Sequence, residues 1–159
     1  MYKRQKVFLI YVRDEDFYQL LPDNLVRKGF DKDRVQVMAF PPIGIETLAP
    51  VIRQHGHEVR MWDTCHPEMK EEHIAAAVKE EKPDAIALSF LSTTSYPATK
   101  SMAKRLKETS PKTPIITGGV FATMNGKEIM EDCEYFDCLG VGEGEELIPD
   151  YLDNLDNLG

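Results

Sequence analysis

The sequence lacks the features that mark several common classes of protein. No apolar run approaches the roughly 18 residues of a membrane span, and the run 7–12 is too short for the apolar part of a signal peptide. The three cysteines, Cys65, Cys133 and Cys138, form no CxxC pair and no zinc pattern. An odd number of cysteines without a signal peptide favours a reducing cytoplasm, where we expect them to be partly buried free thiols.

Positive charge is also scarce. The chain has 19 Lys and Arg against 27 Asp and Glu, a formal net charge of −8. A nucleic-acid backbone or an anionic membrane would repel such a chain, so neither is expected as its main partner. Phosphate-binding fingerprints are missing as well, since the sequence has no GxGxxG after its first strand and no GxxxxGK[ST]. A response-regulator site is excluded because the central strand ends in Ser89 rather than an aspartate.

What the sequence does contain is a regular alternation of strand and helix patterns over 159 residues, a length that suits one domain. This alternation predicts an α/β fold with a five-stranded, mainly parallel sheet, doubly wound in the flavodoxin or Rossmann manner, with helices on both faces. A binding cleft is then expected at the carboxyl ends of the strands. The predicted strands are 7–12, 58–62, 85–88, 115–117 and 136–141, and the predicted helices are 45–55, 71–81, 97–108, 127–131 and 145–155.

Two local expectations concern Pro50, which lies in a predicted helix, and the length of the connection 13–42. Pro50 would be harmless if its helix began near Thr47, because N–H groups of the first turn have no intrahelical partner. Residues 13–42 are too many for an ordinary connection and include several large apolar side chains. This stretch is either a structural excursion or a lid over the strand ends, and the sequence leaves both open.

Small residues follow two of the predicted strands. Ser89-Phe90-Leu91 ends one, and Gly118-Gly119 ends the next. Two glycines after a strand allow unusual backbone conformations and the close approach of a ligand, although a tight turn is the alternative. Hydroxyls after Ser89 could face a ligand or cap the next helix, as Ser95 before Pro97 would do well. Gly142-Glu143-Gly144 forms a third loop of this kind, for which a capped helix start is the alternative.

Taken together, these motifs resemble the cobalamin-binding domain found at the N-terminus of many radical SAM enzymes. The resemblance extends over nearly the whole chain. The segments that carry it are Pro41-Pro42-Ile43-Gly44-Ile45, His55-Gly56-His57-Glu58-Val59, Lys82-Pro83-Asp84-Ala85-Ile86, Ser89-Phe90-Leu91, Gly118-Gly119 and Val141-Gly142-Glu143-Gly144-Glu145.

The resemblance implies cobalamin as the cofactor, bound base-off. The DxHxxG loop of related methyltransferases and mutases, whose histidine ligates cobalt, is missing. The nucleotide tail would enter between the Ser89 and Gly118 motifs, and the corrin would lie above the strand ends. His66 is the one nearby candidate for a cobalt ligand, although the preferred interpretation is a solvated loop histidine. His55, His57 and His73 are expected at helix ends or on the surface. No catalytic or metal-ligating residue is assigned. The implied cofactor-binding residues are Pro42, Gly44, Ser89, Phe90, Leu91, Ser92, Thr93, Gly118, Gly119, Val120, Gly142 and Glu143.

The sequence has no CxxxCxxC motif for the iron–sulfur cluster of a radical SAM barrel. We therefore expect residues 1–159 to be a single cobalamin-binding domain from a longer enzyme, whose barrel in the same polypeptide binds a [4Fe-4S] cluster and S-adenosylmethionine. The branch most resembled contains the anaerobic oxidative cyclase of magnesium-protoporphyrin IX monomethyl ester, in chlorophyll and bacteriochlorophyll biosynthesis. Methyl transfer and ring cyclisation both remain open for the parent enzyme.

Two other functions remain as alternatives. The domain could be a vestigial interaction or sensor module that no longer binds cobalamin. It could also be a stand-alone enzyme that uses the cleft hydroxyls and Glu143, although no base–nucleophile pair stands out among the motifs.

Overall fold

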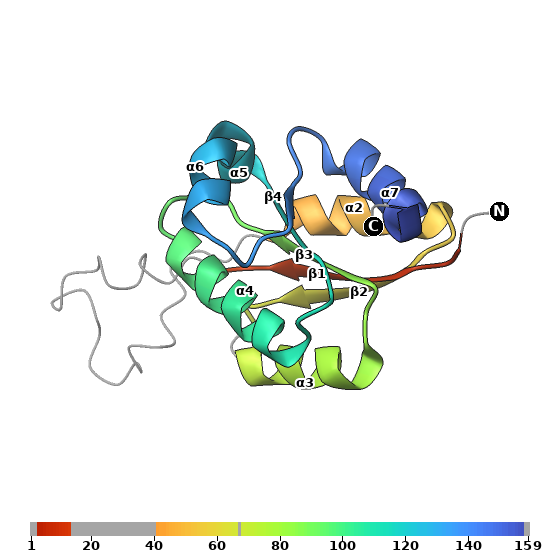
Figure 1. Ribbon diagram of the computed structural model, residues 1–159, viewed down its shortest axis with the longest axis horizontal. Helices are drawn as coiled ribbons and strands as arrows, with labels where there is room; N and C mark the ends of the chain where they lie inside the picture. The colour runs from red at the N-terminus through yellow and green to blue at the C-terminus, as the bar shows by residue number, and fades with distance from the viewer. Residues whose placement is uncertain (1–2, 14–40, 67, 158–159) are drawn as a thin grey trace, which may run out of the picture.

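The computed structural model describes residues 3–13, 41–66 and 68–157. Five strands form one sheet in the order β2-β1-β3-β4-β5, and all four neighbouring pairs are parallel (Figure 1). This is the flavodoxin-like order, which confirms the predicted fold class. The strands are β1 (Lys6–Tyr11), β2 (Glu58–Asp63), β3 (Ala85–Ser89), β4 (Ile115–Gly118) and β5 (Cys138–Leu139).

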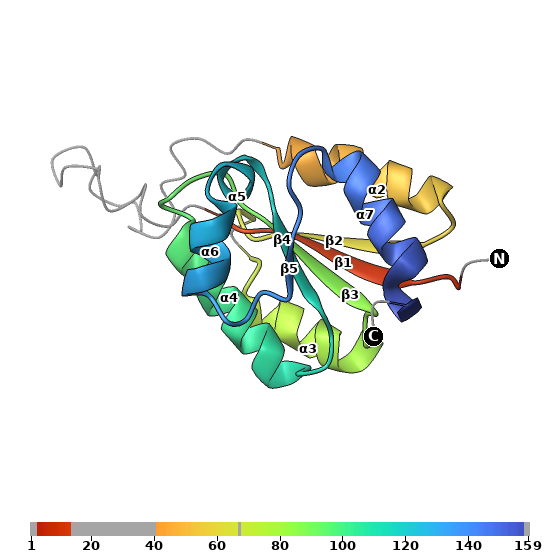
Figure 2. The same ribbon diagram turned by 45° about the horizontal axis from the view of Figure 1, so that its top comes forward.

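Helices cover both faces of this sheet. The helices α2 and α7 lie side by side on one face, and α3 and α4 lie on the other (Figures 1 and 2). The helices are α2 (Ile43–Gln54), α3 (Glu71–Glu81), α4 (Tyr96–Thr109), α5 (Val120–Met124), α6 (Gly126–Asp132) and α7 (Gly144–Asn154), followed by a 3-10 turn at Leu155–Asn157.

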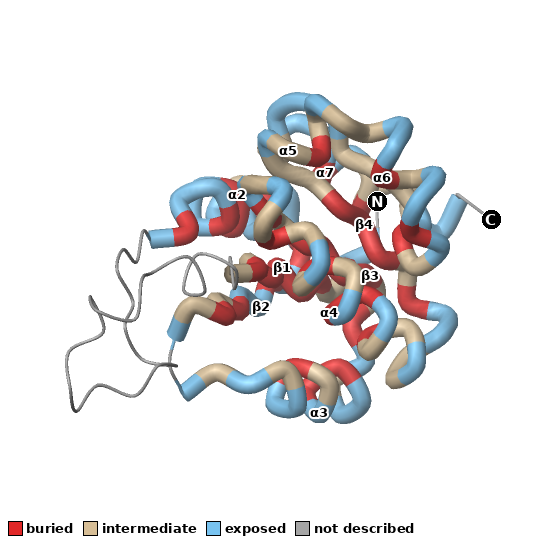
Figure 3. Tube along the Cα trace, turned by 90° about the vertical axis from the view of Figure 1, so that its left-hand side faces the viewer, coloured by how far each residue is buried: buried red, intermediate tan, exposed pale blue. Residues whose placement is uncertain are grey.

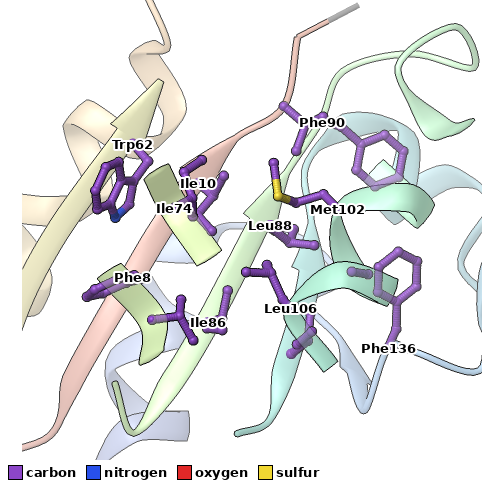
Figure 4. Packing of buried hydrophobic residues seen from close by; sticks show 14 of the residues in the cluster. Phe8, Ile10, Trp62, Ile74, Ile86, Leu88, Phe90, Met102, Leu106 and Phe136 are labelled. Atoms are coloured by element: carbon purple, nitrogen blue, oxygen red, sulfur yellow. The ribbon is translucent and has the colours of Figure 1, made fainter. Parts of the chain in front are cut away.

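The two faces of the sheet belong to separate apolar cores. Successive residues of a strand point to opposite faces, so Phe8, Ile10 and Leu88 pack against α3 and α4 (Figure 4). Val7 and Leu9 pack instead against α2 and α7. Most residues of the central strands are buried, as Figure 3 shows by colour, and they pack into a core on each face of the sheet. This explains why the strands appear in the sequence as continuous apolar runs rather than as alternating patterns.

Most predicted elements are confirmed to within two residues, and three expectations are corrected. Helix α2 begins at Ile43 rather than near Thr47, so Pro50 lies inside the helix. Buried residues lie on both sides of this proline, Ile45, Leu48 and Ala49 before it and Ile52 after it, whereas the proline itself is exposed.

The other two corrections concern the last strand and the segment before it. Strand β5 is only two residues long instead of the predicted 136–141, because it pairs with one neighbour, the four-residue β4. Residues 120–124, expected as loop, form helix α5 before the predicted short helix. The expected excursion or lid at 13–42 lies almost entirely outside the described residues, and both alternatives stay open.

Candidate functional site

The ends of β3 and β4 are aligned. Ser89 pairs with Gly118 in the parallel register, and Tyr11 of β1 flanks Ser89 on the other side. The small residues predicted at two neighbouring strand ends therefore lie next to each other at the carboxyl edge of the sheet. A ligand of a doubly wound sheet is expected at this edge.

The hollow at this edge arises from a difference between the two faces of the sheet. On the face toward α2 and α7, β3 presents Ala87 and Ser89, and β4 presents Ile116 and Gly118. On the opposite face the same strands carry large residues, with Leu88 and Phe90 in the core against α4. Small side chains on one face leave space between the sheet and its helices on that face only.

This space is a cavity of about 470 Å³, which we call the cleft. Its inner part, the cleft floor, consists of the aliphatic side chains of Leu9, Leu48, Ala87, Ile116 and Ile148, all at most 9% exposed. Further residues of α2, α5 and α7 and of the loops after β3, β4 and β5 complete the lining: Gly44, Ile45, Thr47, Leu88, Ser89, Leu91, Thr117, Gly118, Gly119, Val120, Thr123, Met124, Gly140, Gly142, Glu143, Gly144, Glu145 and Leu147.

Polar groups gather at the rim of the cleft and are partly tied to one another. The Thr47 hydroxyl donates to the Glu145 carboxylate at 2.8 Å, which joins the first turns of α2 and α7. The Gly142 N–H donates to the Thr123 hydroxyl at 3.2 Å. Within the described part of the chain, Glu143 and Glu145 are the only charged residues that line the cleft. The described part of the rim thus offers hydrogen-bond acceptors to a ligand.

Eight of the twelve predicted cofactor-binding residues line the cleft: Gly44, Ser89, Leu91, Gly118, Gly119, Val120, Gly142 and Glu143. Several lining residues lie outside the motifs, among them Leu48, Ala87, Thr123 and Ile148, and Glu145 lies in a motif but was not assigned to cofactor binding. The spacing of Ala87 and Ser89, two small residues on one face of a strand, is the signal that could have identified Ala87.

The other four predicted residues are placed elsewhere. Phe90 follows Ser89 and so points to the opposite face, where it is fully buried and stacks on Tyr96 at 5.8 Å between ring centroids. Pro42 is buried just before α2, and Thr93 is exposed outside the cleft. Ser92 is bonded within its own loop, where its N–H donates to the Ser95 hydroxyl at 3.2 Å.

The same loop corrects the expected helix cap. Ser95 does precede α4, and Pro97 does lie in its first turn, as predicted. However, the Ser95 hydroxyl donates to the Ser92 carbonyl at 3.0 Å and makes no bond to a helix N–H. The hydroxyls of this loop therefore stabilise the loop itself.

Gly118 and Gly119 have different structural reasons to be glycine. Gly119 has φ +109°, a left-handed conformation, and a Cβ there would lie 2.5 Å from the carbonyl oxygen of Phe90. A Cβ on Gly118 would meet only the Gly140 carbonyl, at an ordinary 3.8 Å. The turn alternative thus accounts for Gly119, whereas the packing of the chain itself does not require a glycine at position 118.

The histidines lie away from the cleft. His66 is exposed in the loop after β2, where its Nδ1 accepts from the Glu68 N–H at 3.3 Å. His57, expected at a helix end or on the surface, is instead buried before β2, at the opposite end of the sheet. Its Nδ1 accepts from the Gln5 N–H, and its Nε2 lies 3.2 Å from the Asp153 carboxylate without the geometry of a hydrogen bond.

All three cysteines are free thiols, as predicted. Cys133 is buried and the other two are partly exposed. Burial, reinforced by the nearby charge of Asp63, raises the pKa of the Cys65 thiol to about 12. Burial likewise raises the pKa of Cys133 and of Cys138. None of the three has the depressed pKa of a reactive thiol.

A family model described as the B12 binding domain matches residues 37–152. The chain belongs to the B12-binding domain family. Relatives of this B12-binding domain include an uncharacterized methyltransferase of Pyrococcus horikoshii, 27% identical over 72% of the chain and 25% of the relative. The hopanoid C-3 methylase of Methylococcus capsulatus is 29% identical over 74% of this chain and 23% of the methylase. The anaerobic magnesium-protoporphyrin IX monomethyl ester cyclase of Cereibacter sphaeroides is 24% identical over 69% of this chain and 18% of the cyclase.

Solved structures agree on the fold. The cobalamin-dependent S-adenosylmethionine radical enzyme OxsB aligns with 98% of this B12-binding domain and 19% of its own chain, with a TM-score of 0.73 and 15% identity. The methanol:cobalamin methyltransferase complex of Methanosarcina barkeri aligns with a TM-score of 0.59 and 19% identity, over 97% of the domain and 46% of that chain. The domain spans about a quarter or less of the length of the curated relatives it matches. Within the described residues, no helix has the length and apolar character needed to cross a membrane.

Proposed function

We propose that this domain binds cobalamin in the cleft, with the nucleotide tail between the sheet and helices α2 and α7. The observation that carries the proposal is the one-sided set of small residues, Ala87, Ser89 and Gly118, which opens a cavity of about 470 Å³ at the carboxyl edge of the sheet. The family match over residues 37–152 supports the same ligand.

The residues of the cleft fit such a group. The cleft floor would receive the flat base of the tail, and Gly118 leaves room where a side chain would otherwise project. The first turns of α2 and α5, with Gly44 and Val120, and the loop of Glu143 before α7 would lie under the corrin at the rim. Carboxylates at positions 143 and 145 can accept hydrogen bonds from the amide side chains that cobalamin carries. When bound, cobalamin supplies a cobalt centre that can carry and transfer a methyl group.

We propose base-off binding without a protein ligand to cobalt. In the part of the chain that the structure describes, no histidine lines the cleft, and His66 lies outside it in an exposed loop. The histidine loop of related methyltransferases is also missing from the sequence. A neutral, apolar floor suits a tail base that has left the cobalt.

We further propose that the domain serves a longer radical SAM enzyme. The relatives named above include methylases and an anaerobic cyclase, each about four or more times longer than the stretch that matches. The [4Fe-4S] cluster and S-adenosylmethionine would then bind to a barrel in the same polypeptide, in the cytoplasm. Methyl transfer, or ring closure on magnesium-protoporphyrin IX monomethyl ester, would be the reaction of that whole protein.

Retention of a corrinoid by the purified chain tests the proposal. The chain is mixed with hydroxocobalamin or methylcobalamin, free ligand is removed, and the visible spectrum is recorded. Retained corrin absorbance in a stoichiometric amount, shifted toward the base-off form, is expected. Failure to retain corrin after incubation at high micromolar ligand contradicts cobalamin binding by this domain and leaves the vestigial module as the better description.

A further inference from the structure

We propose that the cleft selects among corrinoids by the base of their nucleotide tail, accepting a benzimidazole and discriminating against a purine. This inference rests on the proposed function, because it requires the tail to enter the cleft. It concerns the chemistry of the cleft floor, which neither the fold nor the family match specifies.

The cleft floor offers no hydrogen-bonding side chain. Its five residues are aliphatic, and Leu9, Ile116 and Ile148 are 0%, 3% and 6% exposed. Backbone N–H and C=O groups of β1 and β3 are engaged in the parallel pairing of the central sheet. A base that reaches this floor therefore meets methyl and methylene groups.

The polar side chains of the cleft lining lie at its rim, at its open end or on the opposite face of the sheet, and none belongs to the cleft floor. Thr47 donates to Glu145, and Thr123 accepts from the Gly142 N–H. Thr117 is fully buried, but it lies between Ile116 and Gly118 in β4 and so points to the opposite face of the sheet. Ser89 belongs to the last pair of the β3–β4 ladder, at the strand end where the cleft opens.

Benzimidazole and purine tails differ in how many of their own hydrogen-bonding groups would have no partner on the cleft floor. Dimethylbenzimidazole presents two methyl groups on its outer edge, and these gain from burial against aliphatic side chains. Adenine presents an exocyclic amine and two further ring nitrogens, which lose their bonds to water and find no replacement. Leaving even one or two such groups unpaired weakens binding about tenfold to several hundredfold.

A comparison of three corrinoids on the same protein tests the inference. The whole 159-residue chain is titrated with hydroxocobalamin, with its adenine-tailed analogue, and with cobinamide, which has no nucleotide tail. Affinities are measured by equilibrium dialysis, and base-off binding is followed in the visible spectrum. We expect cobalamin to bind at least about tenfold more tightly than the adenine-tailed analogue, and cobinamide to bind more weakly than cobalamin.

The possible failures are distinguishable. Equal affinity for the two complete corrinoids, or tighter binding of the adenine form, overturns the inference and leaves the proposed function intact. Cobinamide binding as tightly as cobalamin also overturns it, because the tail would then contribute nothing. Retention of none of the three overturns the proposed function itself and the inference with it.

A pair of matched variants locates the selectivity in the floor. Ile116→Thr adds a hydroxyl to the cleft floor on a β-branched side chain that suits a strand, and it should reduce the preference for cobalamin by at least about threefold. Ile115→Thr changes the neighbouring residue, which is equally buried but packs into the opposite core. It should lower stability and leave the ratio of the two affinities unchanged. A ratio that is the same in Ile116→Thr as in the unmodified chain contradicts the assignment to the floor.

Discussion

Gly118 and Gly119 are neighbours in sequence, yet the structure requires a glycine only at the second position. Gly119 adopts a left-handed backbone beside the Phe90 carbonyl. Gly118 has ordinary space around its missing side chain and borders the cleft. A functional reason is therefore needed for the first glycine and not for the second.

This difference predicts effects of different size for two substitutions on the free energy of unfolding. Gly119→Ala should lower the free energy of unfolding by about 1–3 kcal/mol, because it forces a Cβ into strained backbone and against a carbonyl oxygen. Gly118→Ala should change the free energy of unfolding by less than about 1 kcal/mol. Urea denaturation followed by circular dichroism measures both. Equal destabilisation by the two changes would contradict the distinct roles.

The thiol of Cys65 gives a second prediction at the residue scale. With its pKa raised from 9.0 to about 12, the thiol is deprotonated far less at pH 8 than a free cysteine. Since thiolate is the reactive form, alkylation of Cys65 by iodoacetamide should be at least about a hundredfold slower in the folded chain than in urea. Mass spectrometry of the Cys65 peptide against time measures this. Comparable rates in the folded and unfolded chains would show that neither burial nor Asp63 suppresses the thiolate.

At the scale of elements, the cleft depends on how α7 lies beside α2. The Thr47–Glu145 hydrogen bond joins their first turns at the cleft rim. Near the opposite end, the Asp153 carboxylate of α7 lies 3.2 Å from the buried His57 Nε2. A pair of contacts at the two ends of α7 thus fixes the helix that forms one wall of the cleft.

Removal of the buried contact should loosen α7. Asp153→Ala removes the carboxylate that lies 3.2 Å from the buried His57 Nε2 and should lower the free energy of unfolding by about 1–3 kcal/mol, because the buried ring loses its nearest polar contact on that side. Asp156→Ala is the matched control, since it removes an aspartate whose partner is the exposed Lys3, and it should cost less than about 0.5 kcal/mol. Denaturant midpoints of the two variants test the comparison. An equal effect would mean that the His57–Asp153 contact does not anchor the helix.

An element could be predicted from the sequence when its packing required a clear apolar pattern. Helix α3 and the central strands have strong apolar patterns, and their predicted positions are confirmed. Strand β5 and helix α5 are short, and pairing and packing with β4 define them rather than a pattern of their own. The extent of α2 was predicted to within two residues, but Pro50 lies inside the helix rather than in its first turn, because the buried face of the helix outweighs the helix-breaking tendency of proline.

The candidate site was predictable only where its residues stand out in the sequence. Glycines and the residues after strand ends are visible as motifs, and most of them line the cleft. The floor residues Leu48 and Ile148 look like any core residue of a helix, since only the tertiary packing decides that the sheet opposite them is hollow. Phe90 was included because it is adjacent to Ser89 in sequence, but adjacent residues of a strand face opposite ways.

For the molecule as a whole, the two faces of the sheet serve different purposes. The face toward α3 and α4 carries the large aromatic and aliphatic side chains, and we regard it as the stabilising core. The face toward α2 and α7 is incompletely packed at one end, where the cleft lies. A ligand that fills this cavity should therefore stabilise the whole domain.

Thermal unfolding tests this consequence. A ligand present at a hundred times its dissociation constant adds about 2.7 kcal/mol to the free energy of unfolding. For a domain of this size, that should raise the melting temperature by about 5–10 °C. Differential scanning fluorimetry with and without hydroxocobalamin measures the shift, and cobinamide should give a smaller one. No shift at saturating corrinoid would contradict binding in the cleft.

The central claim is that the space left by Gly118 receives the nucleotide tail of cobalamin. It is tested most directly by equilibrium dialysis of the unmodified chain and of Gly118→Leu against hydroxocobalamin, with urea midpoints for both proteins. The account predicts stoichiometric base-off binding by the unmodified chain and at least about a hundredfold weaker binding by the variant, with both proteins folded. Equal affinity of the two folded proteins for cobalamin would contradict it.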